Sequence, residues 1–366
     1  MPSRSALTIS IHELPQSPIR LSLRPIIDKG YRDTDCPPIR VKHLVNRLPY
    51  PLFRFLANRL SPAGPKARLS ILIFHRVLPE IDPLFPGQAT VESFDAQLDL
   101  LKSVFNVLPL PEAVSQLKAG TLPARSAAIT FDDGYADNVT NALPILQKHG
   151  LHATFFIATS YLNGGRMFND TVIESVRRSP LTRLDLNDLD LGAHELDSDV
   201  AKAKAIGKIL PQVKYLPLDV REDTVAQVVT RAGVGSLPDD LMMTTSQLKT
   251  LHAAGMEIGG HTHRHPILAK LDPNTVRDEI VAGKIWLEDT LCTPVRVFAY
   301  PNGKPGSDYL PEQADIVREL GFEGAVSTQR GVSTRPSDVF QLPRFTPWDV
   351  NQTAYALRLL QNIVTG

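Results

Sequence analysis

The sequence predicts an α/β fold in which a parallel sheet curls into a closed or nearly closed barrel. Short apolar runs alternate with segments of helical periodicity on both sides of one long irregular break. This alternation favours parallel strands joined by helices that cover the sheet, and the number of units fits a barrel. The hydrophobic content of 43% and the charged content of 21% are those of an ordinary globular protein.

The first block of alternating elements begins near residue 68. The run Leu69–Phe74 is apolar except for Ser70, as expected of a strand that is buried on both faces. Gly120 and Gly150 stand where two helices should end. We expect strands at Leu69–Phe74, Phe105–Leu108, Ser126–Phe131 and Ala153–Ala158, and helices at Val91–Val104, Pro111–Leu117 and Asp137–His149.

The alternation resumes after the break, at about Thr245. A Thr-Ser pair suited to N-capping begins one helix, and Asp272 with Pro273 provides the N-cap and the first residue of the next. We expect helices at Thr245–Ala254, from Pro273 to about Thr290 and at Glu312–Leu320, and strands at Met256–Gly259, Val295–Ala299, Phe322–Val326 and Phe340–Phe345.

Two stretches fall outside the alternating pattern. Residues 163–244 are charged and irregular, and we interpret them as an insertion into the barrel, either a lid or substrate wall or a passive surface elaboration. Residues 1–66 are proline-rich and would form a partly disordered N-terminal extension, so that the barrel domain spans 67–366. A short basic amphipathic helix within 41–60 would either pack on this domain or touch a membrane surface.

The composition narrows the classes of function. Because 39 basic residues balance 39 acidic ones, no global field recruits nucleic acid or an anionic membrane, and neutrality suits an uncharged substrate such as a glycan. Cys36 and Cys292 lack a CxxC spacing, which argues against a disulfide framework or a cysteine-built metal site. Without a recognisable secretory signal or 18 consecutive apolar residues, we expect a cytoplasmic protein with no transmembrane segment. A misassigned start site would leave association with the cell envelope open.

Polar residues capable of chemistry follow four of the expected strands. They are His75, the pair Asp132 and Asp133, the pair His261 and His265, and the run Tyr300-Pro301-Asn302-Gly303. Because the carboxyl ends of parallel strands meet on one side of the fold, we expect these residues to lie together. One carboxylate with two histidines is a set of ligands for a divalent cation, and a second carboxylate can accept a proton from water. The sequence therefore predicts metal-assisted hydrolysis.

Each of these features also has an ordinary structural explanation. A pair of aspartates is usually a solvated turn, and two histidines four residues apart are common on helix surfaces. His75 alone would be a core histidine bonded to the backbone, and Arg296 an exposed charge at a strand end. Only their joint occurrence at several strand ends favours the functional interpretation.

The same segments resemble the polysaccharide deacetylase family, also called carbohydrate esterase family 4 or the NodB homology domain. The matching segments are TFDDGY at Thr130–Tyr135, HTxxH at His261–His265 and RxFxxPxG at Arg296–Gly303, in the family's order within residues 68–345. The resemblance implies a distorted (β/α)7 barrel and metal-dependent removal of N-acetyl groups from amino-sugar polymers. The substrate would be an N-acetylated polysaccharide or oligosaccharide.

The resemblance assigns the metal ligands and the base. Asp133, His261 and His265 would bind one divalent metal ion, and Asp132 would be the general base. Zinc is the metal that we expect for this donor set, although Co²⁺, Ni²⁺ and Mn²⁺ are also compatible with it.

Five further residues have roles that the resemblance implies. Arg296 would pair with Asp132 and keep that carboxylate ionised. Thr262 would steady the histidine loop by hydrogen bonding. Tyr135, Tyr300 and Asn302 would lie at the substrate and its oxyanion, with Asn302 acting through its backbone N–H.

The general acid departs from the family pattern. The family usually places a histidine near its C-terminus, whereas His265 is the last histidine of this chain. Some exopolysaccharide deacetylases of this type have a rearranged strand order and begin with a strand that ends in a histidine. His75 follows such a strand, and a closed barrel can put the first strand beside the last. We therefore expect His75 to be the acid.

Two other functions remain open at this point. Some relatives of the fold open cyclic ureides or imides and lack a full acid/base set, which fits the missing C-terminal histidine. Against this, residues 163–244 and Trp348 could line a glycan groove that a small ring does not need. A non-catalytic glycan-binding protein would be favoured by loss of ligands or base, but all four of those residues are present.

Overall fold

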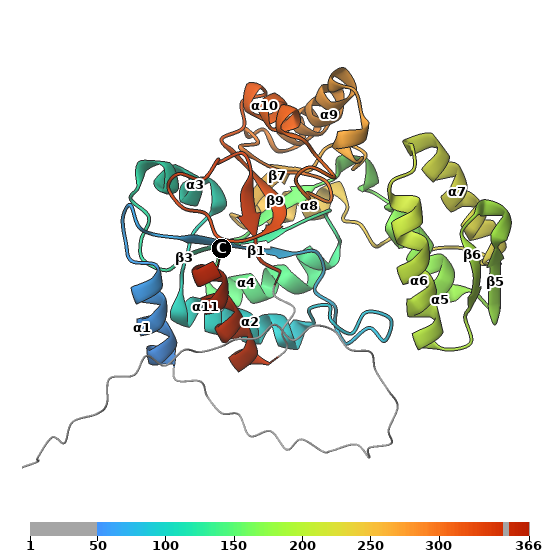
Figure 1. The fold of residues 1–366 in the computed structure, drawn as a ribbon, viewed down its shortest axis with the longest axis horizontal. Coiled ribbons are helices and arrows are strands. Elements are labelled where there is room, and N and C mark those ends of the chain that lie inside the picture. Colours follow the sequence, from blue (N-terminus) through green and yellow to red (C-terminus); the bar gives the residue numbers. More distant parts are fainter. Residues whose placement is uncertain (1–49, 347–350, 366) are drawn as a thin grey trace, which may run out of the picture. The chain divides into compact units, whose positions relative to one another are not determined.

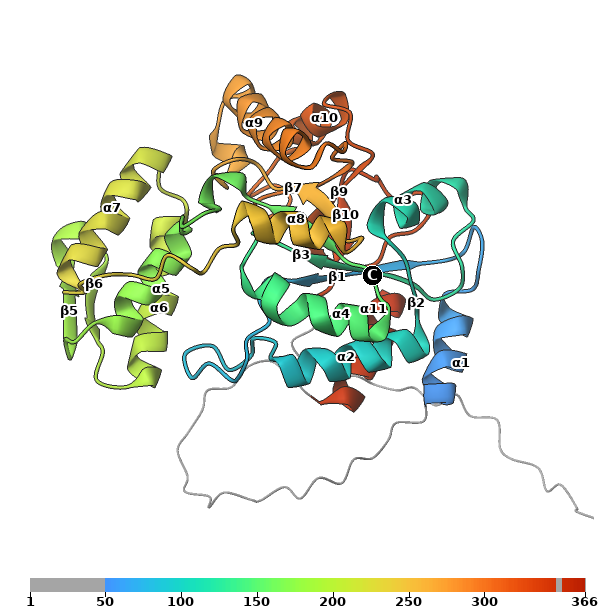
Figure 2. The same ribbon diagram turned by 180° about the vertical axis from the view of Figure 1, so that it is seen from behind.

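A computed structural model of the chain describes residues 50–346 and 351–365 (Figures 1 and 2). All of these residues belong to one compact unit. Residues 1–49, which make up most of the expected N-terminal extension and include Cys36, lie outside the described residues, and so does Trp348.

Parallel strands form the barrel that the alternating pattern predicts. They are β1 (Leu69–Phe74), β3 (Ser126–Phe131), β4 (Thr154–Ile157), β7 (Glu257–Gly260), β8 (Val297–Ala299), β9 (Gly324–Arg330) and β10 (Leu342–Arg344), hydrogen-bonded in that order. A short strand, β2 (Asn106–Val107), pairs with the start of β3. The two edges of the sheet meet where Phe345, directly after β10, donates to Ile71 O at 2.7 Å and accepts from Ile73 N at 3.0 Å. The sheet is therefore nearly closed into a barrel.

The helices between the strands lie close to the predicted positions, except that the helix expected at Asp137–His149 begins as a π-helix (Asn138–Ala142) and becomes α-helical only from Leu143. They are α2 (Val91–Val104), α3 (Leu110–Ala119), α4 (Leu143–His149), α8 (Thr245–Ala253), α9 (Pro273–Leu291) and α10 (Pro311–Glu319). Thr90 and Thr244 form capping boxes that begin α2 and α8. Gly120 and Gly150 end α3 and α4 with φ of 71° and 64°, a left-handed conformation that glycine adopts without strain.

Strands β1 and β3 are buried on both faces, as their apolar sequences predict. Every residue of β1 and β3 is buried. One alternate set of side chains, which includes Phe74 and Phe131, packs in the main core with the surrounding helices. The other set, which includes Ile71 and Ala128, packs in a second cluster with α3, as expected for side chains on the inner side of a barrel.

Helix α1 (Tyr50–Leu60) belongs to the barrel domain, although the sequence boundary at 66/67 placed it in the extension. Its Phe53 and Ala57 are buried in the main core. The helix packs against α2 and against a C-terminal helix, α11 (Gln352–Thr365), which the sequence pattern did not predict. Helix α1, which is the described part of the basic amphipathic helix expected within 41–60, therefore packs on the barrel domain.

The segment between β4 and α8 forms a small lobe with a core of its own (Figure 1). It contains α5 (Phe168–Arg178), β5 (Arg183–Leu186), β6 (Gly192–Glu195), α6 (Asp199–Lys214) and α7 (Leu218–Arg231), with β5 and β6 paired as an antiparallel hairpin. A separate hydrophobic cluster holds the lobe together and includes Val172, Ile206 and Val228. Leu84, from the segment after β1, joins this cluster and so links the lobe to the barrel.

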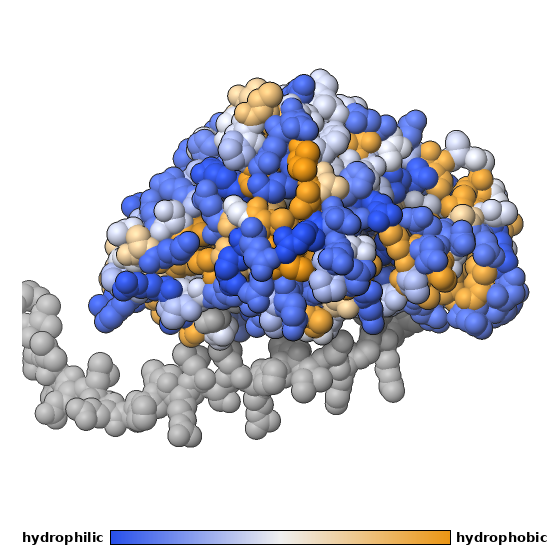
Figure 3. All heavy atoms as spheres, turned by 90° about the horizontal axis from the view of Figure 1, so that it is seen from above, coloured by the Kyte–Doolittle hydropathy of each residue, from blue (hydrophilic) through white to orange (hydrophobic). Residues whose placement is uncertain are grey.

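The outer surface has the usual mixture of polar and apolar side chains. On the face seen in Figure 3, hydrophilic residues predominate and apolar side chains reach the surface in separate groups. Among the helices within residues 50–346 and 351–365, none combines the length and the apolar character that are needed to cross a membrane.

Candidate metal centre and active site

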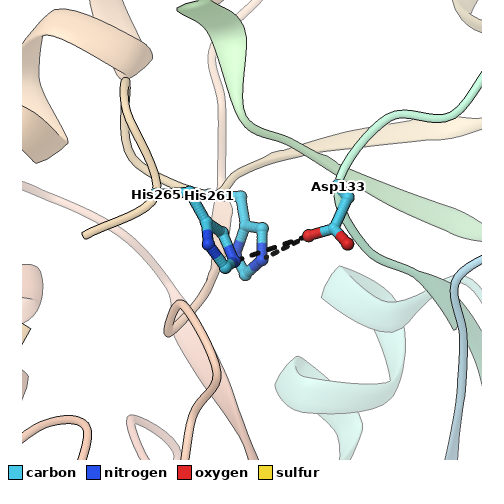
Figure 4. Close-up of side chains that lie close together, drawn as sticks. All are labelled: Asp133, His261 and His265. Carbon is cyan, nitrogen blue, oxygen red and sulfur yellow. Dashed lines mark ion pairs between the residues drawn. The ribbon is translucent and has the colours of Figure 1, made fainter. Parts of the chain in front are cut away.

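The three predicted metal ligands converge in a buried cluster after β3 and β7 (Figure 4). The Nε2 atoms of His261 and His265 lie 3.4 Å and 3.5 Å from Oδ1 of Asp133. All three side chains are buried. Two ligand atoms about 2.0–2.2 Å from a tetrahedral ion lie about 3.3–3.6 Å apart, so these donors fit one small divalent cation.

The backbone at these ligands adopts a conformation that non-glycine residues rarely take. Asp133, Thr262 and His265 have φ of 79°, 63° and 52°. Such positions cost on the order of 1–3 kcal/mol each and persist where the surrounding contacts fix them. One such contact is the hydrogen bond from His265 N–H to Oγ1 of Thr262 at 3.0 Å, which links two residues of the histidine loop.

The protonation of the two histidines suits ligation through Nε2. Nδ1 of His261 lies 2.7 Å from the carbonyl oxygen of Ala299, which can only accept, so Nδ1 carries the hydrogen. Burial lowers the pKa of His265 to about 3 and keeps that ring neutral. Burial also opposes a charge on His261, but its hydrogen bond to Asp133 and the nearby carboxylates outweigh this and raise its pKa. A bound cation would replace the proton that His261 shares with Asp133.

The second carboxylate, Asp132, forms a buried ion pair with Arg344. Both guanidinium NH groups donate to it at 2.7 Å, one to each oxygen, and the two side chains are 0% and 3% exposed. Arg344 is itself held by a 2.8 Å hydrogen bond from Nε to Ser327 O. Burial alone would raise the pKa of Asp132, but the charge and hydrogen bonds of Arg344 hold it below its usual range. Asp132 is therefore ionised at neutral pH.

The prediction that Arg296 pairs with Asp132 is wrong. Arg296 lies on the surface, 44% exposed, where it pairs with Glu257 at 2.9 Å. It precedes β8, whereas the site lies at the carboxyl ends of the strands, so its side chain is at the other end of the barrel. Its ordinary explanation, an exposed strand-end charge, holds. Sequence reasoning missed Arg344 as the partner of Asp132. The available indication was an arginine between the apolar residues Leu342 and Phe345 of a strand, because a buried charge needs a partner.

His75 lies where the sequence predicted, at the carboxyl end of β1. The register pairs Phe74 with Phe131, so His75 stands beside Asp132 across two adjacent strands. Its backbone oxygen accepts a hydrogen bond from Asn138 Nδ2 at 2.8 Å, and its side chain is exposed to the cavity that holds the ligand cluster. His75 therefore lies where its side chain can reach a substrate bound in the cavity.

The tyrosine of the third motif does not face the substrate, contrary to the prediction. The ring of Tyr300 is buried and stacks on Tyr309 with centroids 3.8 Å apart, and its hydroxyl donates to Phe340 O at 2.8 Å. Side chains two residues apart on a strand share a face, and Phe298 already packs toward the helices. Asn302 does line the cavity, with φ of 59° and a side-chain Nδ2 that has no partner among the described residues.

Tyr135 and the inserted lobe complete the site. The Tyr135 hydroxyl is buried and donates to Oδ2 of Asp170, a residue of α5, at 3.0 Å. The cavity in front of the ligand cluster has a volume of about 560 Å³. Its lining comes from the barrel strand ends, from the segment after β1 and from the lobe, so the insertion contributes a wall of the site. No local sequence pattern indicated Asp170, because the lobe reads only as charged and irregular.

Comparisons with known proteins identify the family of the chain. A family model described as polysaccharide deacetylase matches residues 119–214 and 218–325. The protein YxkH of Bacillus subtilis (strain 168), which carries the polysaccharide deacetylase name, is 21% identical over 280 residues, 76% of this chain and 71% of that protein. The poly-β-1,6-N-acetyl-D-glucosamine N-deacetylase of Staphylococcus aureus (strain N315) is 32% identical over 104 residues. Those residues are 28% of this chain and 36% of that enzyme, so only about a third of its length is matched.

Two solved structures share the fold. The Streptococcus pyogenes deacetylase PplD, in complex with acetate, is 20% identical with a TM-score of 0.53, over 81% of this chain and 98% of that chain. IcaB from Ammonifex degensii is 20% identical with a TM-score of 0.52, over 82% of this chain and 97% of that chain. With the family model matching more than half of its residues, the chain belongs to the polysaccharide deacetylase family.

Proposed function

We propose that this protein is a metal-dependent hydrolase that removes N-acetyl groups from an amino-sugar polysaccharide or oligosaccharide. The observation that carries the proposal is the buried cluster of Asp133, His261 and His265 with the ionised Asp132 beside it, all on one cavity. The name of the Staphylococcus aureus relative makes a β-1,6-linked N-acetylglucosamine polymer the first substrate to test.

Asp133, His261 and His265 would hold the divalent cation. Two imidazoles and one carboxylate favour zinc, although Co²⁺, Ni²⁺ and Mn²⁺ accept the same donors. When bound, the ion supplies a Lewis acid that polarises the acetyl carbonyl and lowers the pKa of water.

Asp132 has the position and the charge of the general base. As water adds to the acetyl carbon, Asp132 accepts its proton, and the carbon–nitrogen bond then breaks to give acetate and a free amine. Arg344 acts through Asp132: its two hydrogen bonds keep the carboxylate ionised and fix its orientation. Arg344 is therefore a positioning residue.

His75 is the proposed general acid, because the leaving amine must gain a proton as the carbon–nitrogen bond breaks. His75→Ala should lower kcat on an N-acetylglucosamine oligomer by about 10²–10⁴-fold, the usual effect of losing a positioned acid. Metal content should be unchanged. An aryl acetate, whose leaving group needs no proton, should be hydrolysed at nearly the wild-type rate. Equal losses on both substrates would show that His75 is not the acid.

Arg296→Ala should leave both kinetics and metal content unchanged. The side chain is 44% exposed and pairs with Glu257 on the surface. Exposed ion pairs contribute about 0–1 kcal/mol to stability, so the melting temperature should shift little. A variant with a lowered kcat and an intact fold would contradict the placement of Arg296 outside the site.

The two alternative functions have less support in the structure. A cyclic ureide or imide is small, whereas the cavity of about 560 Å³ is extended by a folded lobe and has room for sugar units. Glycan binding without catalysis would not require an ionised carboxylate held by a buried arginine beside three metal donors.

One experiment tests the proposed function. Elemental analysis should find about one divalent ion per chain, and the loaded protein should release acetate from partially N-acetylated glucosamine polymers. Chelation should stop this release and zinc should restore it. Ring opening of allantoin or hydantoins by a loaded protein that releases no acetate would replace the proposal with the ureide alternative.

A further inference from the structure

The inserted lobe forms part of the wall of the catalytic cavity. Residues of the α5 region between 167 and 177 and residues at the end of α6 between 210 and 215 line the cavity together with the metal ligands. Among these lobe residues, Asp170 is the carboxylate that hydrogen-bonds a residue of the TFDDGY segment, Tyr135. It therefore joins the lobe to the catalytic motif.

Asp170 is buried, yet one of its oxygens is free for a ligand. The side chain is 4% exposed, and Oδ2 accepts the 3.0 Å hydrogen bond from the Tyr135 hydroxyl. Oδ1 has no hydrogen-bond partner in the part of the chain that the structure describes, and Asp170 lines the cavity. An oxygen without a partner on a side chain that lines a cavity is available to a ligand that enters the cavity.

Within residues 50–346 and 351–365, Asp170 forms no ion pair. Arg76, the cation whose charge acts on Asp170, pairs with Asp137 at 2.7 Å and lies over the ring of Tyr135. Burial is the main influence on Asp170; it outweighs the Tyr135 hydrogen bond and the charge of Arg76, with Asp133 and Glu174 acting in the same direction as burial. The pKa of Asp170 rises to about 7, so near neutral pH the carboxyl group can donate as well as accept a hydrogen bond.

The lobe is also fastened to the barrel at the end of α6. Tyr215, just after α6, donates its hydroxyl to Oδ1 of Asp308 at 3.1 Å, and Lys214 Nζ lies 3.4 Å from the same oxygen. Asp308 is 1% exposed and belongs to the segment between β8 and α10, which also carries Asn302. These contacts hold the wall in place at both ends.

We propose that Asp170 is a specificity-determining residue that binds a hydroxyl group of the sugar unit in the cavity through Oδ1. A sugar hydroxyl donates and accepts hydrogen bonds, and so does a carboxyl group that is partly protonated. Tyr135 is the positioning residue that orients this carboxyl group. The inference rests on the proposed function, because it takes an N-acetylated amino sugar as the substrate.

The experiment compares a sugar substrate with a substrate that has no sugar. Asp170→Ala and the larger, apolar Asp170→Leu are assayed for acetate release from an N-acetylglucosamine pentamer and for hydrolysis of 4-nitrophenyl acetate. Pentamer binding to the metal-loaded proteins is measured by calorimetry. Asp170→Asn, which can still donate and accept, tests for rescue. Asp199→Asn, an exposed first-turn carboxylate of α6, is the matched control for effects on a lobe helix.

We expect both apolar variants to raise KM and Kd for the pentamer by about tenfold or more, the effect of one lost buried hydrogen bond. Their hydrolysis of 4-nitrophenyl acetate should stay within about twofold of wild type, which also shows that they fold. Asp170→Asn should recover most of the affinity. Asp199→Asn should behave as wild type on both substrates.

Other outcomes would overturn the proposal, and they are distinguishable from failure of the proposed function. Equal losses on the ester and the pentamer would give Asp170 a structural role only. Acetate release by the wild type with unchanged KM and Kd in both apolar variants would also sink the proposal while leaving the deacetylase function intact. If pentamer binding depends on Asp170 but the wild type releases no acetate, the role of Asp170 in binding would stand and the deacetylase function would be wrong. A wild-type protein that neither binds nor deacetylates the pentamer would overturn both.

Discussion

We expect Asp133→Ala to empty the metal site and abolish deacetylation, whereas Asp132→Asn should abolish turnover and keep the metal. Oδ1 of Asp133 faces Nε2 of both histidines at 3.4 Å and 3.5 Å, so its removal takes away one of three donors. Asp132 instead directs both oxygens to Arg344. Losing a general base costs about 10²–10⁴-fold in rate, and losing the ion removes the Lewis acid as well.

The measurement pairs elemental analysis with acetate release for each variant. Asparagine has nearly the size of aspartate, so Asp132→Asn changes charge and proton acceptance without opening a cavity. Each variant is the control for the other, because the two carboxylates are adjacent and both buried but differ in their partners. If Asp132→Asn also lost the metal, the division of labour between the two carboxylates would be wrong.

The parts of the site that could be predicted are those encoded by neighbouring residues. Asp132 and Asp133 follow one apolar run, and His261 and His265 stand four residues apart after another. Parallel strands bring such strand ends together whatever the details of packing, because their carboxyl ends share one side of the fold. His75 was placed in the same way, by its position after β1.

The parts that could not be predicted depend on contacts distant in the sequence. Arg344 reaches Asp132 across 212 residues, and it does so only because the sheet curls until β10 meets β1. Asp170 reaches Tyr135 from a lobe whose sequence shows no periodic pattern. Tyr300 is a different case, because in the structure it shares a strand face with Phe298 and its side chain points toward the helices. The motif resemblance misdirected that assignment.

Arg344→Met should be the most destabilising substitution in the site. Methionine fills much of the volume but leaves the carboxylate of Asp132, 3% exposed, without its partner. Breaking a buried ion pair by removing one member costs about 3–5 kcal/mol, because the remaining charge stays desolvated. Denaturant unfolding measures this loss. The double variant Asp132→Asn with Arg344→Met should recover part of it, since no unpaired charge remains.

The pH dependence of the stability of Arg344→Met follows from the direction in which the pKa of Asp132 shifts. In the wild type, the pKa of Asp132 is below its unfolded value, so the pair's contribution is present above about pH 4 and is lost as the pH falls further. Without Arg344, burial is the largest influence that remains, and we expect it to raise the folded pKa above the unfolded one. Ionisation then opposes folding, so the destabilisation should grow as the pH rises from about 4 through the new pKa.

The acidic limb of the pH–rate profile should move to higher pH in Arg344→Met, because Asp132 must be ionised to accept a proton. The metal-loaded Arg344→Met variant should therefore lose activity at a higher pH than the wild type, while Arg296→Ala keeps the wild-type limb. A limb that does not move in Arg344→Met, or a destabilisation that is the same at all pH values, would show that Arg344 does not set the charge of Asp132. The bidentate contact at 2.7 Å, sealed from solvent, leads us to expect both effects.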